Sequence, residues 1–409
     1  MSPAVEERAV DLTIVLPTRN EAGNLSALFD GLAALARESR IAYEVLVVDA
    51  GSRDGTAELA ASLGARVYQQ RGSGYGAALA EAFREVRGDF VVTMDADLSH
   101  SPFVIRDLYR RRLDADVLIA SRYVRHGFSE TERLRSMLSR ILNGVFRVAL
   151  DLPYLDLSSG YRLYRRQALA ELGITSGDFD VLIEILVRLH NRGFRIAEVP
   201  FHYRPRRYGE SNARLLKFAL SYWRTLGRMA RLRASREAAD FEDRGFFSPN
   251  PIRRAWHRGK YRWAMQHLEG SARILDLTAG STRLLEGLPQ AVGLDVSLPK
   301  LRYRQPLGRR LVQGEPLRLP FADSTFDAVA VFQPDPELER GASLWAEIAR
   351  VLKPAGKLVY GTLQMADGEA RVATAGFAVK ARAVLLGRML LVAGERLEDA
   401  RPGATAGLA

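Results

Sequence analysis

The sequence of 409 residues contains no cysteine and no uninterrupted apolar run of the length that crosses a bilayer. The absence of cysteine excludes disulfide bonds, thiolate zinc sites and cysteine nucleophiles. A transmembrane helix needs about 20 apolar residues, so the sequence predicts no such helix. The first ten residues also lack the apolar core of a signal peptide. We therefore expect any contact with a membrane to be peripheral.

The chain is strongly basic, with 59 lysine and arginine residues against 48 aspartate and glutamate residues, a net charge of +11. Such an excess favours an anionic partner: a phosphate-rich substrate, an acidic membrane surface or nucleic acid. An arginine-rich composition without a special partner is the alternative interpretation. No recognisable nucleic-acid-binding module accompanies the charge, so nucleic acid is not expected as a partner.

The first half of the chain alternates short apolar runs with amphipathic stretches. Helices are expected from a cap near Asn24 and over residues 55–63. Buried strands are expected at residues 12–17, 43–50, 90–97 and 117–123. This alternation predicts an α/β fold with a mostly parallel sheet, which binds its ligands beyond the carboxyl ends of the strands.

The length and the hydrophobic fraction of 47% favour two packed domains. The first is expected at residues 1–228. A charge-rich segment that ends in two prolines, residues 229–255, is expected to be a linker. A smaller second α/β domain is expected at residues 256–398, followed by a disordered tail at residues 399–409.

Three polar segments each follow a predicted buried strand: PTRNEAGN, VVDAGSRDGT and VTMDADLSH. In the third, Asp95 and Asp97 are separated by one residue and can both project toward one ligand. Two carboxylates at a strand end suit Mg²⁺ or Mn²⁺ bridging the two phosphates of a nucleotide sugar. Such a metal would offset the charge that develops on the leaving nucleoside diphosphate.

Residues 11 to about 226 resemble family-2 glycosyltransferases with a GT-A fold, of the dolichyl- or polyprenyl-phosphate mannose synthase type. Besides the three segments above, the matching motifs are RGSGYGAAL, IASRYV, LDLSSGYRLYRR, FDVLIEIL and EVPFHYRPRRYGESN. The resemblance implies inverting transfer of a sugar, mannose from GDP-mannose before glucose from UDP-glucose, to a polyprenyl or dolichyl phosphate. It implies a cytoplasmic enzyme that is peripheral at the inner face of a membrane.

The resemblance also implies roles for individual residues. Asp95 and Asp97 would hold the metal, and the catalytic residues would be Asp97, Arg122 and Arg206. The donor nucleotide would be bound by Pro17, Arg19, Glu21, Asp49 and Asp95. The sequence departs from the family pattern at Ala50, where relatives have a second acidic residue, and at Ser99, where they often have a glutamine that binds the metal.

The acceptor phosphate is expected to lie among guanidinium groups, which suit bidentate phosphate recognition. The resemblance assigns this role to Arg122, Arg133, Arg135 and Arg206. A phosphate acceptor is already anionic near neutral pH, so its oxygen needs little deprotonation. Glu184 is therefore expected to have a structural role. A glycosyltransferase with a hydroxyl acceptor, in which Glu184 would act in catalysis, is the alternative.

Two stretches mix arginines with apolar residues at helical spacing, residues 132–152 and 214–233. Such helices can lie in a membrane interface and receive a polyprenyl tail. The same spacing is typical of an ordinary helix that faces a protein core, and both interpretations stay open.

The second domain resembles class I methyltransferases over ARILDLTAGSTRLLEGLP, AVGLDVS, LRLPFADSTFDAVAVF and EIARVLKPAGKLVYGT. The resemblance places an S-adenosylmethionine site at Asp276, Gly280 and Asp295, with Asp295 on the ribose hydroxyls. Thr278 and Thr282 stand where relatives have glycines, and the region after residue 362 is short for the last strands. A degenerate domain is therefore expected, and a bifunctional enzyme that also methylates is the alternative.

Overall fold

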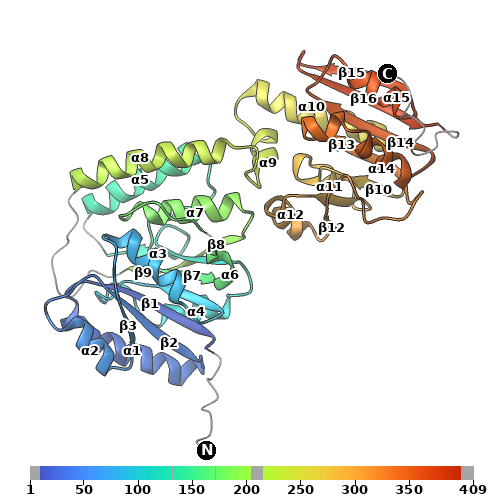
Figure 1. Cartoon of the computed structure of the whole chain (residues 1–409). Helices are drawn as coiled ribbons and strands as arrows, with labels where there is room; N and C mark the ends of the chain where they lie inside the picture. Colours follow the sequence, from blue (N-terminus) through green and yellow to red (C-terminus); the bar gives the residue numbers. More distant parts are fainter. Residues whose placement is uncertain (1–9, 131–132, 171, 204–214, 398–409) are drawn as a thin grey trace, which may run out of the picture. The chain divides into compact units, whose positions relative to one another are not determined.

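The computed structural model describes residues 10–130, 133–170, 172–203 and 215–397. They form two compact units, each with its own sheet (Figure 1). Unit 1 comprises the chain up to residue 190 and residues 194–233, whereas unit 2 comprises residues 191–193 and the chain from residue 234 onward.

Unit 1 is built on a seven-stranded sheet with the strand order β3-β2-β1-β4-β7-β5-β8. β1, β2, β3 and β4 run parallel, and only β7 is antiparallel to its two neighbours, β4 and β5. The predicted mostly parallel α/β sheet is thus confirmed. The strands are β1 (Leu12–Thr18), β2 (Tyr43–Asp49), β3 (Arg66–Gln69), β4 (Phe90–Thr93), β5 (Val117–Ser121), β7 (Arg162–Arg165) and β8 (Ile196–Pro200), with a separate pair β6 (Phe128–Ser129) and β9 (His202–Tyr203).

Helices cover both faces of this sheet because its central strands are apolar on both sides. Successive residues of a strand point to opposite faces; Ile14 accordingly packs in one buried cluster with α1, and Val15 in another with α3 and α7. The helices of unit 1 are α1 (Ala22–Ser39), α2 (Thr56–Ser62), α3 (Tyr75–Glu85), α4 (Val104–Arg110), α5 (Arg133–Leu150), α6 (Arg166–Leu169), α7 (Val181–Asn191) and α8 (Leu215–Ala234).

Several predicted boundaries differ from the observed ones, and two of these differences bear on the site. The first helix is not capped by Asn24: it begins at Ala22, and the Asn24 amide donates instead to Glu21 Oε2 at 2.7 Å. The strand expected at residues 90–97 ends at Thr93. Asp95 and Asp97 therefore belong to the loop beyond the strand. Their side-chain directions are not fixed by the alternation of faces along a strand.

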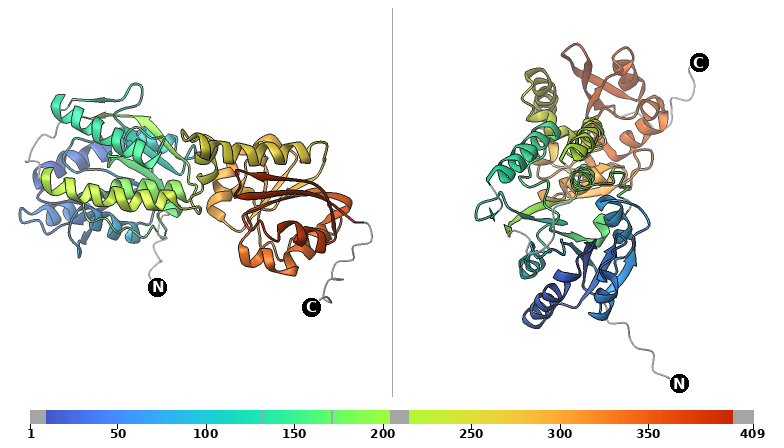
Figure 2. Two further views of the ribbon diagram at one scale, coloured as in Figure 1. Left: turned by 90° about the horizontal axis from the view of Figure 1, so that it is seen from above. Right: turned by 90° about the vertical axis from the view of Figure 1, so that its left-hand side faces the viewer.

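α5 and α8 lie side by side, as both views of Figure 2 show, and share a buried apolar cluster with Phe146 and Met229. The ring of Phe146 meets Tyr222 of α8 edge to face at 5.8 Å between centroids. The opposite face of α5 stays exposed. Its apolar side chains are between 47% and 82% exposed: Met137, Leu138, Ile141, Val145 and Val148.

Unit 2 is also α/β, with the strand order β12-β11-β10-β13-β14-β16-β15. β10, β11, β12, β13 and β14 run parallel to one another, and β16 is antiparallel to its two neighbours, β14 and β15. The strands are β10 (Ile274–Asp276), β11 (Val292–Asp295), β12 (Arg310–Gln313), β13 (Phe326–Phe332), β14 (Leu352–Thr362), β15 (Phe377–Leu385) and β16 (Met389–Arg396). β15 and β16 show that the chain after residue 362 does complete the sheet.

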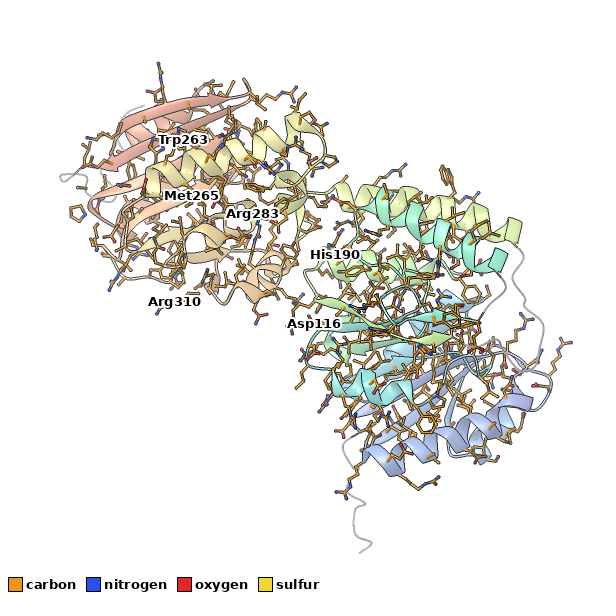
Figure 3. All side chains as sticks on the ribbon, turned by 180° about the vertical axis from the view of Figure 1, so that it is seen from behind. Asp116, His190, Trp263, Met265, Arg283 and Arg310 are labelled. Atoms are coloured by element: carbon orange, nitrogen blue, oxygen red, sulfur yellow. The ribbon has the colours of Figure 1, made fainter. Side chains whose placement is uncertain are left out.

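The helices of unit 2 begin inside the segment predicted as a linker, residues 229–255. α8 continues to Ala234, and α9 and the start of α10 follow. Asp243 of α9 pairs with Arg283 (labelled in Figure 3) at 2.6 Å and with Arg304 at 3.0 Å, so α9 belongs to the packed unit. The helices, with two 3₁₀ turns, are α9 (Phe241–Phe246), α10 (Pro251–Leu268), η1 (Ala279–Ser281), α11 (Leu284–Gly287), α12 (Leu298–Arg304), η2 (Gln305–Leu307), α13 (Pro336–Arg340), α14 (Ala342–Val351) and α15 (Gly368–Thr374).

Candidate active site

The loops that follow β1 and β2 are locked together by hydrogen bonds. Asn20, which has a left-handed backbone with φ 58°, donates its N–H to Ser52 Oγ at 2.8 Å and accepts from Arg53 N at 2.9 Å. Asp54 accepts from the backbone of Ala22 at 3.1 Å. Because parallel strands end at the same edge, this contact builds one polar rim beyond β1 and β2.

Asp49 stands at the centre of this rim and is buried. Its Oδ2 accepts the backbone N–H groups of Gly51 at 3.1 Å and Ser52 at 2.9 Å, and its Oδ1 accepts the hydroxyls of Ser52 and Thr18. These contacts fix the loop after β2. Of the other predicted donor residues, Arg19 is exposed, whereas Pro17 and Glu21 are half-buried on the same rim.

Asp95 and Asp97 lie in the loop after β4, the strand that pairs with β1. Asp97 is buried, and its Oδ1 accepts both the backbone N–H of Ser99 at 3.0 Å and the Ser99 hydroxyl at 2.5 Å. The side chain of Asp95 is 37% exposed. Ser99 therefore orients a carboxylate, in the position where the related enzymes often have a metal-binding glutamine.

His100, which the sequence did not single out, supports the same loop. Its Nδ1 accepts the backbone N–H of Asp95 at 2.9 Å, which leaves the ring proton on Nε2, 3.8 Å from Asp95 Oδ2. Burial lowers the pKa of His100, against the opposing effect of Asp95 and Asp97. The ring also stacks on Tyr161 at 4.8 Å between centroids. A neutral imidazole thus fixes the Asp95 backbone.

Tyr75, the first residue of α3 within the RGSGYGAAL motif, lies beside Asp95. A Cβ placed on Gly160 would be 2.9 Å from the Tyr75 hydroxyl and 3.8 Å from Asp95 Oδ1, so the three groups adjoin. That hydroxyl is buried and has no hydrogen-bond partner among the residues the structure describes. The loop is held by the N–H of Gly76, which donates to Gly177 O at 2.8 Å.

The residues at this edge fit a divalent metal that shares its ligands with a substrate. No group of three or more histidine and carboxylate side chains converges within the described residues, so an all-protein metal cage is absent there. Mg²⁺, however, is commonly held by one or two carboxylates together with substrate phosphates. Asp95 and Asp97 supply two carboxylates, and the 37% exposed side chain of Asp95 is accessible to such a ligand.

Arg122, after β5, is held by a buried carboxylate that the sequence analysis did not assign. Its Nε and one terminal nitrogen donate to the two oxygens of Asp156 at 2.8 Å each, and its side chain is only 17% exposed. Burial opposes the charge of Asp156, but the Arg122 hydrogen bonds outweigh it and lower the pKa of that carboxyl. Both groups are therefore charged at neutral pH.

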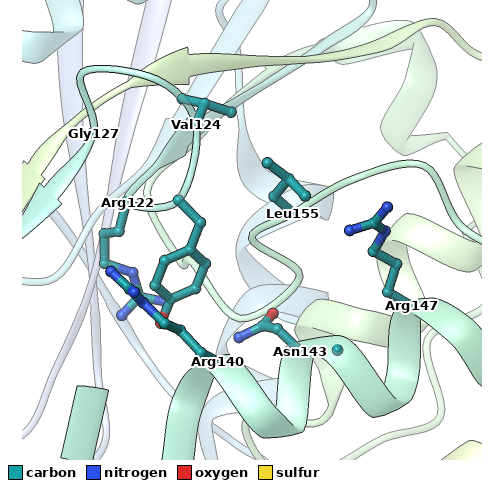
Figure 4. Close-up of a pocket in the computed structure, with 9 residues that line it drawn as sticks. Arg122, Val124, Gly127, Arg140, Asn143, Arg147 and Leu155 are labelled. Atoms are coloured by element: carbon teal, nitrogen blue, oxygen red, sulfur yellow. The ribbon is translucent and has the colours of Figure 1, made fainter. Parts of the chain in front are cut away.

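A cavity of about 290 Å³ opens between Arg122 and α5. Figure 4 shows Arg140, Asn143 and Arg147 on the helix side, with Val124 and Leu155 across from them. Asn143 joins the two sides, since its Oδ1 accepts from Leu157 N at 2.7 Å and its Nδ2 donates to Ser158 at 3.0 Å. Three guanidinium groups from two elements thus line one cavity.

The structure tests the remaining predicted acceptor residues only in part. Arg206 lies outside the described residues, and so do the side chains of Arg133 and Arg135, although these two residues begin α5. Glu184, on α7, is buried and accepts from Thr175, Ser176 and Arg188. Its contacts are those of a structural residue, as expected.

The predicted cofactor residues of unit 2 do come together. Asp276 ends β10, Asp295 ends β11, and Gly280 lies in the turn η1 between them. Gly280 donates its N–H to Asp295 Oδ2 at 2.9 Å. All three are buried.

The sequence matches two family models. Residues 13–173 match the glycosyl transferase family 2 model, and residues 275–360 match a methyltransferase domain model. The two resemblances that the sequence suggests are therefore confirmed by family models over these ranges. Within the described ranges, no helix is long and apolar enough to span a bilayer.

Among curated proteins, the chain is similar to the dolichol-phosphate mannosyltransferase of Pyrococcus furiosus, with 32% identity over 49% of this chain and 58% of the relative. It is also similar to the glycosyltransferase AglJ of Haloferax volcanii, with 31% identity over 47% of this chain and 63% of the relative. The chain thus spans less than two thirds of the length of these relatives.

Solved structures of similar fold include the glucosyl-3-phosphoglycerate synthase of Mycobacterium tuberculosis in complex with Mn²⁺, UDP and glucosyl-3-phosphoglycerate. The TM-score is 0.44 at 24% identity, over 54% of this chain and 80% of that one. The mannosyl-3-phosphoglycerate synthase of Rubrobacter xylanophilus has a TM-score of 0.43 at 24% identity, over 56% of this chain and 75% of that one.

Proposed function

We propose that this protein is an inverting glycosyltransferase that moves a sugar, mannose from GDP-mannose as the first expectation, to a polyprenyl phosphate at the inner surface of a membrane. The observation that carries the proposal is the arginine-lined cavity beside Arg122, set against a helix whose outer face is apolar and exposed. A family 2 glycosyltransferase domain surrounds it.

On the donor side, Asp95 and Asp97 supply the carboxylates for Mg²⁺ or Mn²⁺, which would offset the charge of the leaving nucleoside diphosphate. Ser99 and His100 keep this loop in place through hydrogen bonds at both ends. The exposed part of the Asp95 carboxylate is the part of this loop that a substrate can reach.

On the acceptor side, the cavity suits an anion that is attached to an apolar chain. Arg140 and Arg147 extend from the exposed side of α5, and no carboxylate of the described residues holds them in the way that Asp156 holds Arg122. Guanidinium groups bind phosphate through paired N–H donors. The apolar residues of the same helix, among them Ile141 and Val148, continue the site toward a lipid.

A phosphate acceptor also agrees with the contacts of Glu184. This carboxylate accepts from Thr175, Ser176 and Arg188, and hydrogen bonds of this kind lower its pKa against the effect of burial. It is therefore a poor proton acceptor. A phosphate oxygen that is already ionised needs no such base, and the residues of the site then serve to bind and align the two substrates.

The membrane surface is the remaining partner. The exposed apolar side chains of α5 and the Trp223 ring on α8, which is 71% exposed, form the kind of basic and apolar surface that lies in a lipid headgroup layer. The net charge of +11 adds attraction to anionic lipids.

The proposal is tested with the full chain, Mn²⁺ or Mg²⁺, radiolabelled GDP-mannose and UDP-glucose, and a short-chain polyprenyl phosphate. We expect transfer to the lipid phosphate and none to the corresponding polyprenol. Absence of transfer to the phosphate with every donor would refute the proposal, and transfer to the polyprenol alone would favour a hydroxyl acceptor.

Two variants locate the chemistry. Asp97→Ala should abolish transfer, whereas Asp89→Ala, which removes a 75% exposed carboxylate before β4, should leave it unchanged. Arg140→Ala should raise the KM for the lipid phosphate with little effect on kcat, because it removes binding that is equal in ground and transition states. Full activity of Asp97→Ala would exclude its metal role.

A further inference from the structure

Unit 2 carries a methyltransferase-type domain, and its predicted cofactor residues Asp276, Gly280 and Asp295 form hydrogen bonds with other residues of the same unit. We propose that polar side chains of this domain close the S-adenosylmethionine site, so that the protein does not bind this cofactor. The proposal concerns unit 2 alone and is independent of the proposed transfer reaction in unit 1.

Asp295 is the residue that would hold the ribose hydroxyls of the cofactor. Both of its carboxylate oxygens already accept backbone N–H groups: Oδ2 from Gly280 at 2.9 Å and Oδ1 from Ser297 at 2.8 Å. The residue is only 7% exposed. Each oxygen keeps a second acceptor site, but a residue that is so little exposed gives a ribose hydroxyl almost no surface from which to reach it.

Gly280, the one glycine kept from the family motif, is covered by a side chain. A Cβ on Gly280 would lie 2.3 Å from Cδ and 2.5 Å from Cβ of Lys300. The missing side chain of Gly280 thus makes room for Lys300 of α12. In a cofactor-binding domain the same space lets a ligand approach the backbone.

The residues that replace motif glycines are bonded within the domain. The hydroxyl of Thr282 donates to Asp276. The hydroxyl of Thr278 accepts the backbone N–H of Phe332, at the end of β13, at 2.9 Å. Each replacement therefore fastens the turn to a neighbouring element, and the turn is more closed than a run of glycines would be.

A buried ion cluster supports the turn from the side of α10. Lys260, which is 2% exposed, donates to Ser281 O at 2.7 Å and pairs with Glu242 at 2.9 Å. Glu242 also pairs with His257 at 3.0 Å. Lys260 and Lys300 both approach Ser281, and S-adenosylmethionine carries a positive sulfonium. Glu242 balances the charge of Lys260, so the ammonium group of Lys300, 3.4 Å from the Ser281 hydroxyl, is the one that disfavours this cofactor by repulsion as well as by space.

The direct test is titration of the full-length protein with S-adenosylmethionine and S-adenosylhomocysteine, by calorimetry and by thermal unfolding. Circular dichroism and a cooperative unfolding transition establish that the protein is folded. We expect no binding heat and a melting temperature unchanged within about 1 °C at about 1 mM ligand. A Kd below about 100 µM for either ligand would overturn the proposal.

Two variants test the mechanism of closure. Lys300 is half-buried, so Lys300→Ala should leave the fold intact, and Lys300→Ala/Thr278→Gly opens the turn further. We expect either variant to bind S-adenosylhomocysteine at least about tenfold more tightly than the wild type. If both variants fold like the wild type and bind no better, these side chains do not close the site and the proposal fails.

Discussion

Asp276 offers the clearest thermodynamic test of the closed site in unit 2. Its side chain is completely buried, and burial raises the pKa of this carboxyl from 3.8 to about 7, with Asp295 acting in the same direction and the hydrogen bond from Thr282 opposing it. The folded protein therefore prefers the neutral acid, whereas the unfolded chain ionises near pH 4. Stability from this residue is present below about pH 4 and is lost as the pH rises to about 7.

Asp276→Asn keeps the shape of the neutral acid but has no group that ionises in this pH range. A shift from 3.8 to about 7 corresponds to roughly 4 kcal/mol at about 1.4 kcal/mol per pKa unit. Relative to the wild type, we expect the variant to gain only about 1 kcal/mol of stability between pH 3 and pH 4.5, and up to about 4 kcal/mol by pH 8.

Urea unfolding at several pH values, followed by tryptophan fluorescence, measures this difference. The chain has 4 tryptophans, and Trp256, Trp263 and Trp345 lie in unit 2, so the signal reports mainly on that unit. Asp367→Asn, which changes a 71% exposed carboxylate, is the matched control and should show no such divergence. Parallel curves for wild type and Asp276→Asn from pH 5 to 8 would refute the reasoning.

Three further outcomes follow from the structure of unit 1. Asp156→Ala leaves the mostly buried Arg122 without its partner and should destabilise the protein by about 3–5 kcal/mol in urea unfolding, against less than about 1 kcal/mol for Asp89→Ala. Ser99→Ala should lose about 1.5–3 kcal/mol and raise the Mn²⁺ concentration for half-maximal transfer, since Asp97 loses a donor. Val148→Glu, at a position that is 82% exposed, should change stability by less than about 0.5 kcal/mol but weaken sedimentation with anionic vesicles at least tenfold, whereas Val384→Glu in unit 2 should not. Unchanged vesicle binding by Val148→Glu would remove α5 from the membrane surface.

The sequence predicts the layers of unit 1 well because apolar runs on both faces of a strand have few other solutions. The period of the pattern gives β1 and β2 nearly to the residue. It does not give the end of β4, because Met94 and Ala96 are apolar and buried although the strand stops at Thr93. Asp95 and Asp97 were identifiable through their spacing, which survives this error.

The residues missed in the site are those whose role depends on contacts distant in sequence. Asp156 meets Arg122 across 34 positions, and the Tyr75 hydroxyl lies next to Gly160, which is far from it in the sequence. Both lie in segments that resemble the family, yet nothing in their spacing indicates a partner. The predicted linker shows the same limit: Glu242 and Asp243 belong to unit 2 through ion pairs that the charge-rich local sequence cannot reveal.

In both sheets, whether an aspartate lies inside a strand or beyond its end determines how far its carboxylate is exposed. In unit 1, β4 stops at Thr93, so Asp95 lies in the loop beyond the sheet with its carboxylate 37% exposed. In unit 2, Asp276 is itself the last residue of β10, aligned with Gly293 and Ala330 of the neighbouring strands and 0% exposed. Asp276 meets the hydroxyl of Thr282 and the backbone N–H of Thr278, whereas Asp95 in its loop can meet a ligand. For Asp95 and Asp276, the position of the strand end thus separates an accessible carboxylate from a closed one.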